Sequence, residues 1–156
     1  MTKRSVTHAT FCIERVYDAE PARVFAAFAD PAAKARWFSG PPDWQTLDET
    51  YDFRVGGHDR QAGRMPDGTI TTFHGLYYDI VPNERIVFSY DMHLNDLRIS
   101  VSLTTIELRP EAGKTRLVFT EQGAFLDGFD NVEGREEGTQ GMLDALGEAI
   151  EFAKAH

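Results

Sequence analysis

The sequence predicts an α+β fold in which a curved antiparallel sheet of seven strands surrounds a long C-terminal helix, with two short helices after the first strand. Apolar and polar residues alternate between residues 51 and 122, which is the period of strands with one buried face. Short turns separate these runs, so successive strands are antiparallel neighbours. The last part of the chain returns to the helical period, and its apolar side matches the face that such a sheet must bury.

The N-terminal part predicts one strand and two short helices. Residues 11–17 alternate well enough for a first strand, whereas residues 1–9 are polar and are expected to form a flexible N-terminus. Pro21 and Pro31 each suit the first turn of a helix, where the N–H that proline lacks would have no partner. The second helix is expected to end near Phe38, before a Gly-Pro-Pro sequence.

Six further strands and a long helix follow. The strands are expected, between turns rich in Gly, Pro and Asn, at residues 51–55, 58–65, 71–81, 85–92, 97–108 and 115–122. Asp130 and Glu133 have the spacing of a capping box, which predicts Asp130 as the N-cap of the long helix. Helical geometry collects the apolar residues of this helix on one inner face: Gly138, Met142, Ala145, Leu146, Ala149, Ile150, Phe152 and Ala153.

Length and charge exclude several classes of protein. We expect one domain over residues 1–156, long enough to bury a hydrophobic core. The net charge is −9, and residues 127–156 alone carry −6, which disfavours binding to nucleic acids and to anionic membranes. No apolar run has the roughly 20 residues of a membrane-spanning helix, and no signal-peptide pattern is present, so we expect a cytoplasmic protein.

Residues that bind metals or cofactors are sparse. Cys12 is the only cysteine, which excludes an intramolecular disulfide, and we expect it to be a small buried residue. The five histidines show no metal-ligand spacing, and motifs for phosphate or dinucleotide binding are absent. We therefore expect neither a metal site nor a cofactor.

Five stretches carry a resemblance to a known superfamily: residues 52–57, 73–75, 79–88, 113–123 and 141–146. From about residue 10 onward the sequence resembles the START-related SRPBCC superfamily. Within it, the sequence is similar to the AHSA-type branch, which contains the C-terminal domain of the activator of the heat-shock chaperone ATPase. The resemblance implies a helix-grip fold, as in START and Bet v proteins, with a cavity between sheet and helix.

The same resemblance implies three kinds of function. Relatives bind lipids, steroids or polyketide-like compounds, some cyclise or dehydrate them, and some regulate a chaperone in the stress response. Many relatives have a Gly-Trp pair in the last helix where this chain has Gly141-Met142. The missing indole implies an enlarged or reshaped cavity.

Three glycines, Gly134, Gly138 and Gly141, lie within one stretch of the long helix. Each costs about 1 kcal/mol relative to alanine in a helix interior, so a spatial reason is expected. Either the missing side chains leave volume for a ligand, or the helix backbone approaches the strands closely. The sequence leaves both open.

Arg135 is the one charged residue on the inner face of the last helix. Strand parity points Glu121 inward together with Leu117 and Phe119, so Glu121 and Arg135 can meet at one end of the cavity. Arg135 would then grip a ligand carboxylate, with Glu121 holding it or acting as a general base. Alternatively, the two residues form a structural ion pair, or Arg135 extends to water.

Aromatic residues supply the remaining candidates for the ligand site. Most of them must belong to the core, but a subset would suit a planar apolar ligand, with a tyrosine hydroxyl to orient it. The predicted ligand-binding residues are Trp37, Phe53, Tyr77, Tyr90, Phe119, Glu121, Arg135, Gly138 and Met142.

The favoured function is the binding of a small hydrophobic or aromatic-carboxylate ligand, without a catalytic residue. One alternative is a co-chaperone-like module that contacts a chaperone, for which the acidic outer face of the last helix would provide electrostatic complementarity. Another is a cyclase or dehydratase that uses Glu121, Arg135 or His58. The sequence leaves the ligand, the reaction and the oligomeric state open.

Overall fold

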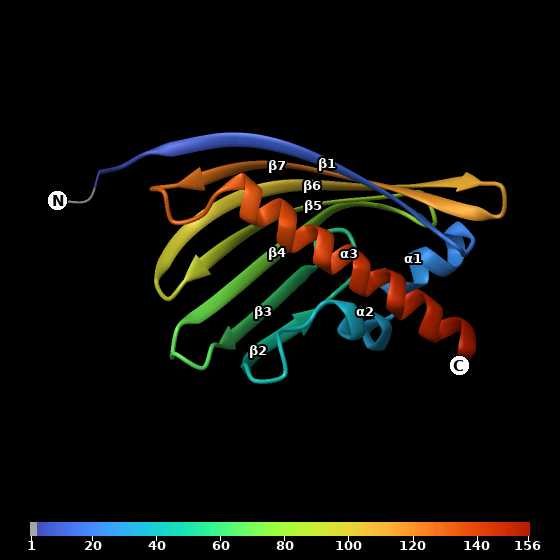
Figure 1. Ribbon diagram of the computed structural model, residues 1–156, viewed down its shortest axis with the longest axis horizontal. Coiled ribbons are helices and arrows are strands. Elements are labelled where there is room, and N and C mark those ends of the chain that lie inside the picture. Colours follow the sequence, from blue (N-terminus) through green and yellow to red (C-terminus); the bar gives the residue numbers. More distant parts are fainter. Residues whose placement is uncertain (1–2) are drawn as a thin grey trace.

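The computed structural model describes residues 3–156 and has the predicted helix-grip architecture, with one seven-stranded antiparallel sheet in the order β1-β7-β6-β5-β4-β3-β2. The long helix α3 crosses the concave face of the sheet, and α1 and α2 lie beside its C-terminal half (Figure 1). The strands are β1 (Val6–Tyr17), β2 (Gln45–Tyr51), β3 (His58–Arg64), β4 (Ile70–Val81), β5 (Arg85–Leu94), β6 (Leu97–Glu111) and β7 (Lys114–Leu126). The helices are α1 (Pro21–Ala29), α2 (Pro31–Trp37) and α3 (Val132–Ala155).

The first strand begins earlier than the sequence predicts. Val6 pairs with Leu126 and Ala9 with Gly123, so residues 6–9 belong to the sheet and not to a flexible N-terminus. Residues 1–2 of that segment lie outside the described residues. Cys12 is exposed, contrary to expectation, because its neighbours in β1 take the inward positions and leave it on the convex face.

The second strand also differs from the prediction. Residues 52–57 form the connection between β2 and β3, whereas a strand was expected at residues 51–55. Gly56 donates to the carbonyl of Tyr77 (2.8 Å), and Tyr77 donates to the carbonyl of Gly57 (3.1 Å), so this connection folds onto β4. A Cβ at Gly57 would lie 2.0 Å from the Asp52 carbonyl oxygen, so Gly57 allows a close backbone approach, whereas Gly56 is favoured by its positive φ of 84°.

The long helix begins with a different cap from the expected one. Asn131 is the N-cap, and its side chain accepts from the Gly134 N–H at 2.8 Å. Asp130 instead accepts from the guanidinium of Arg135. The expected apolar face is wrong at Phe152 and Ala153, which are exposed in the last turn of the helix, and it omitted Leu143, which is buried. The Phe152 ring stacks on the guanidinium of Arg36 (3.5 Å).

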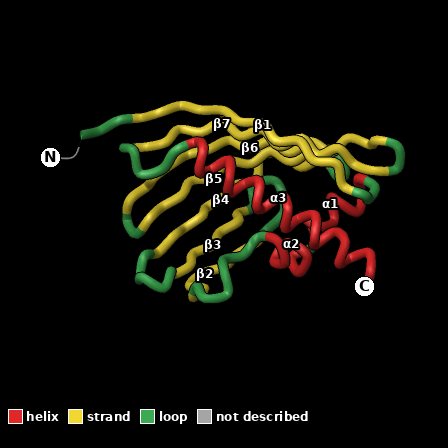
Figure 2. Tube along the Cα trace, in the orientation of Figure 1, coloured by secondary structure: helices red, strands yellow, loops and turns green. Residues whose placement is uncertain are grey.

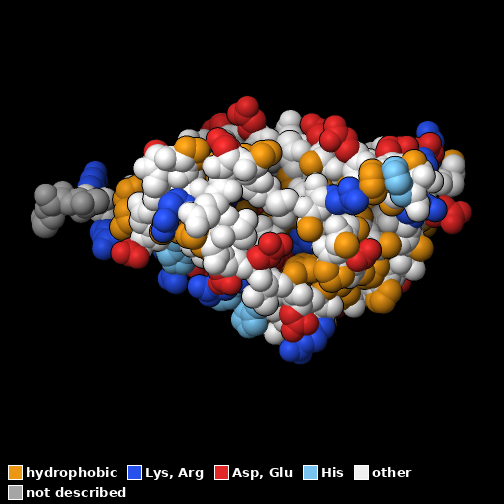
Figure 3. Space-filling view, turned by 90° about the horizontal axis from the view of Figure 1, so that it is seen from below, with side chains coloured by type: hydrophobic (Ala, Val, Ile, Leu, Met, Phe, Trp, Pro, Cys, Tyr) orange, Lys and Arg blue, Asp and Glu red, His pale blue; other side chains and the backbone are white. Residues whose placement is uncertain are grey.

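The C-terminal half of α3 lies next to α1 and α2 on one side of the sheet (Figure 2). The core lies between these helices and the sheet. Leu143, Leu146 and Ile150 of α3 are buried together with Val24 and Phe28 of α1. From the side on which β2 lies, hydrophobic side chains gather toward α2 among charged ones (Figure 3). No helix within residues 3–156 combines the length and apolar character needed to cross a membrane.

Candidate functional site

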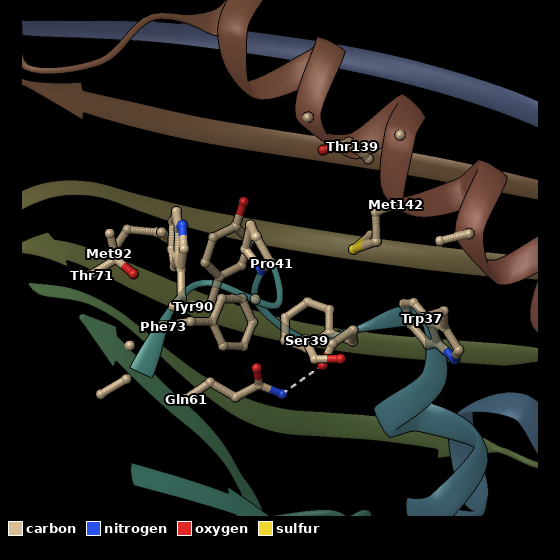
Figure 4. A pocket seen from close by; sticks show the side chains of 18 of the residues that line it. Trp37, Ser39, Pro41, Gln61, Thr71, Phe73, Tyr90, Met92, Thr139 and Met142 are labelled. Atoms are coloured by element: carbon tan, nitrogen blue, oxygen red, sulfur yellow. Dashed lines mark hydrogen bonds between the residues drawn. The ribbon is translucent and has the colours of Figure 1, made fainter. Parts of the chain in front are cut away.

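A cavity of about 700 Å³ lies between the N-terminal half of α3, the concave face of the sheet and the segment that follows α2. Seven of its lining residues are aromatic, and the labelled rings of Trp37, Phe73 and Tyr90 lie on the side opposite α3, from which Met142 projects (Figure 4). The other aromatic residues that line it are Phe38, Trp44, Phe88 and Phe119. Its size lies within the range of about 300–1,000 Å³ typical of small-molecule sites.

The helix glycines help to account for this open volume. A Cβ added to Gly138 or Gly141 would meet no atom within 4 Å, and both residues line the cavity. The close-approach alternative therefore fails for these two positions. Gly134 differs because its Cβ would lie 3.3 Å from the Asn131 side chain that caps the helix.

One end of the cavity is polar and is organised by Arg135. Its Nη1 donates to the Tyr90 hydroxyl at 2.9 Å, and its Nη2 donates to Ser100 Oγ and to Asp130 Oδ2, both at 2.8 Å. Arg135 lies in the first turn of α3, on the side that faces the sheet, and Asp130 just before the helix is close enough to bind its guanidinium. Thr139, one turn further along, donates to the Arg135 carbonyl at 2.9 Å.

Glu121 completes the polar end. Its side chain is 2% exposed and accepts from the hydroxyls of Tyr90 (2.7 Å) and Thr104 (3.0 Å), the latter opposite it on β6. Arg135 Nη1 lies 3.9 Å from Glu121 Oε2. Burial raises the pKa of the Glu121 carboxyl, although these hydrogen bonds and the nearby guanidinium oppose that effect. Arg135 and Glu121 thus form the expected pair on the cavity lining itself.

Seven of the nine predicted ligand-binding residues line the cavity, and Phe53 and Tyr77 do not. Tyr77 is buried beyond it, where its hydroxyl donates to Asp59 Oδ2 at 3.4 Å. Phe53 lies in the β2–β3 connection and packs edge-on against Tyr77 and Phe25, with ring centroids 5.2 and 5.6 Å apart. Both predictions are wrong because the rings belong to the aromatic core next to the cavity.

Sequence reasoning missed several lining residues, including Trp44, Gln61, Phe73, Met92, Asp130 and Thr139. Trp44 could not be assigned because it lies in the irregular segment before β2 and reaches the cavity by packing over Gly40 and Gly63. A signal for the polar end was present in β6, where Ser100, Ser102 and Thr104 alternate on the buried face.

The sequence also gave no sign of a buried ion pair between α2 and β3. Lys34 Nζ lies 2.8 Å from Asp59 Oδ2, and the two side chains are 6% and 3% exposed. Burial lowers the pKa of the Lys34 ammonium, and Asp59 opposes that effect. Neither side chain lines the cavity.

The histidines do not contribute to the cavity. His58 stacks on His74, with Nδ1 and Nε2 of the two rings 3.0 Å apart, and both rings point away from α3 on strands β3 and β4. A cyclase or dehydratase reaction would therefore have Glu121 and Arg135 in the cavity but not His58. Over residues 3–156, no group of three His, Cys, Asp or Glu side chains is placed to hold a metal ion.

Comparison with known proteins agrees with this architecture. The family model described as "Activator of Hsp90 ATPase homolog 1-like protein" matches residues 18–151. The chain belongs to this family. The family fits a ligand-binding or co-chaperone-like protein of the SRPBCC type.

Several solved structures are similar to this chain over nearly its whole length. A protein from Rhizobium leguminosarum is 46% identical, with a TM-score of 0.91 over 96% of this chain and 99% of that one. A protein from Rhizobium loti is 47% identical, with a TM-score of 0.87 over 93% and 99%. An AHSA1-like protein from Aeromonas hydrophila, 23% identical with a TM-score of 0.67 over 95% and 96%, shares the fold. No curated protein matches the chain.

Proposed function

We propose that this member of the family binds a small hydrophobic ligand in the cavity between α3 and the sheet. The observation that carries the proposal is the open space beside Gly138 and Gly141, two helix positions that an alanine would stabilise. A sequence that only needed to pack α3 on the sheet would fill this space with side chains, as it does further along the helix.

The lining supports a flat, mainly apolar ligand. Aromatic rings from the sheet and from the α2 segment line the side of the cavity opposite α3, and Met142 and Met92 add flexible apolar surface. The two buried polar side chains of the lining, Glu121 and Thr139, lie beside Arg135, and this end would orient a ligand with one polar group.

The test uses fluorescence from Trp37 and Trp44, which are the two tryptophans of the chain and both line the cavity. Titration with 2-naphthol and with a panel of fatty alcohols and sterols should change this fluorescence saturably. At a ligand concentration of 100 times Kd, binding should also raise the free energy of unfolding by about 2.7 kcal/mol.

A cavity-filling variant provides the matched control. Gly138→Leu should weaken binding at least about tenfold without loss of stability, because its side chain enters open space. Gln140→Leu adds a similar side chain at an exposed position of the same helix outside the cavity and should bind as the parent does. Equal binding by the two variants would contradict the proposal.

A second candidate function is regulation of a chaperone by protein contact. The observation that favours it is the row of exposed acidic residues along the outer face of α3: Glu133, Glu137, Asp144, Glu148 and Glu151. Charge reversal at Glu137 and Glu148 should then abolish stimulation of a heat-shock chaperone ATPase and leave ligand binding unchanged. If the parent protein gives no stimulation, this candidate is wrong.

A further inference from the structure

Building on the proposed function, we propose that the cavity selects neutral ligands that carry a hydroxyl group and rejects carboxylates, with Glu121 and Asp130 as the residues that determine this specificity. The sequence alone allowed the opposite choice, because an inward arginine is a common partner of ligand carboxylates. The contacts of Arg135 in the folded protein argue against that choice.

The charges around the cavity are unfavourable for an anion. Among the described residues that line it, Arg135 is the single cation, and two of the lining carboxylates, Glu121 and Asp130, lie beside it. Asp130 is in direct contact with the guanidinium at 2.8 Å, and Glu121 is 3.9 Å away. A ligand carboxylate would therefore enter a region whose positive charge is already compensated.

The donors of Arg135 are also largely engaged. Both hydrogens of Nη2 are used, by Ser100 and Asp130, and Nη1 donates to Tyr90. Bidentate binding of a carboxylate needs two parallel N–H groups on one edge of the guanidinium, and both such edges include a hydrogen of Nη2. A ligand could therefore obtain such an edge only by displacing Ser100 or Asp130.

A hydroxyl group finds a suitable partner at the same end. The Tyr90 oxygen donates to Glu121 and accepts from Arg135, so it is fully engaged. The Thr139 hydroxyl lines the cavity and donates to a backbone carbonyl, and its oxygen keeps acceptor capacity. A ligand hydroxyl can donate to the Thr139 oxygen without breaking an existing hydrogen bond.

Glu121 adds a penalty against anions. It is buried, and a second negative charge beside it would require it to take up a proton. Removing the two nearest acidic charges with Glu121→Gln and Asp130→Asn should leave the charge of Arg135 uncompensated. The variant should then accept carboxylates, which is a gain of binding and not merely a loss.

The experiment compares 2-naphthol with 2-naphthoate at neutral pH, two probes that share a ring system and carry a neutral hydroxyl or an anionic carboxylate at the same position. For the parent protein, tryptophan fluorescence and calorimetry should give a Kd for 2-naphthol at least about tenfold lower than for 2-naphthoate. In the Glu121→Gln/Asp130→Asn variant this ratio should fall by at least about tenfold. Asp130→Asn alone, which keeps a hydrogen-bond acceptor for Arg135, should shift the ratio in the same direction if the double variant does not fold.

The matched control removes two acidic charges from the outer face of α3, with Glu137→Gln and Asp144→Asn, and should keep the parent ratio. Tighter binding of 2-naphthoate than 2-naphthol by the parent protein would overturn the inference and leave the proposed function intact. An unchanged ratio in the Glu121 and Asp130 variants would also overturn it. If neither probe and no member of the wider panel binds, the proposed function itself is wrong.

Discussion

The two halves of α3 differ in what lies beneath them. The N-terminal half places Gly138 and Gly141 over open space, whereas the C-terminal half buries Leu143, Leu146 and Ile150. We call the region formed by α1, α2 and the C-terminal half of α3 the packed end. One half of α3 therefore borders the cavity, and the other half makes apolar contacts that stabilise the fold. Substitutions in the first half should mainly change ligand binding, and substitutions in the second half should mainly change stability.

Each region contains one buried charge cluster, and the two clusters are built differently. Lys34 in the packed end has one ionic partner, Asp59, and its ammonium lies among the rings of Trp37, Phe38 and Tyr51 at 4.1–5.2 Å from their centroids. Asp59 Oδ1 has no hydrogen-bond partner among residues 3–156. Arg135 in the cavity instead shares its charge among several groups, so the loss of one partner there should be less costly.

The largest expected effect is at the packed end. Lys34→Met should lower the free energy of unfolding by about 3–5 kcal/mol, because it leaves the Asp59 carboxylate buried without its cation. Chemical denaturation checks this value. The double variant Lys34→Met/Asp59→Leu should recover most of the loss, and a single variant as stable as the parent protein would contradict the contrast between the two clusters.

Removing the cation of the cavity cluster should cost less. Arg135→Met should lower the free energy of unfolding by about 1–3 kcal/mol, since Glu121 can take up a proton and the Asp130 side chain is 26% exposed to water. The same denaturation measurement applies. A loss as large as that of Lys34→Met would show that the two clusters do not differ in this respect.

The cavity cluster should also show a pH dependence of its own. Burial raises the pKa of Glu121, so the folded protein holds this proton more tightly than the unfolded chain does. The resulting stabilisation is fully present below the ordinary pKa of 4.5 and is lost as the pH rises through the raised pKa. Across that window the free energy of unfolding should fall by about 1.4 kcal/mol per pH unit relative to Glu121→Gln. Parallel pH profiles for the two proteins would contradict this assignment.

The smallest expected change in the free energy of unfolding comes from replacing a glycine of α3, and two glycines in different halves of the helix can be compared. Gly141→Ala should raise the free energy of unfolding by about 0.5–1 kcal/mol, because the new methyl group meets open space and the helix gains propensity. Gly147→Ala should gain less or lose stability, since its Cβ would lie 3.1 Å from the Tyr17 ring at the packed end. Thermal denaturation of both variants measures the difference. An equal gain at the two positions would mean that the halves of the helix are packed alike.

The sequence predicted most of the fold and only part of the site. The strand and helix periods identify the sheet and α3, and the inward positions of Arg135 and Glu121 follow from the same periods. Tyr77 also points to the concave face of the sheet, yet it is packed in the core and does not line the cavity. The alternation along a strand gives the face on which a side chain lies, but not whether a cavity or another side chain lies next to it. Trp44 was missed for the opposite reason, since it lies outside any periodic segment.

The amino-acid sequence by itself determined the order of strands and helices, the inward positions of Arg135 and Glu121 and the glycines that α3 places above the sheet. These properties depend on residues close together in the chain, where backbone geometry imposes a period. Only the tertiary structure decided that Asp130 pairs with Arg135, that Lys34 meets Asp59 and that Phe53 lies outside the cavity. Such contacts depend on how the α2 segment and α3 are placed on the sheet, which no local pattern specifies.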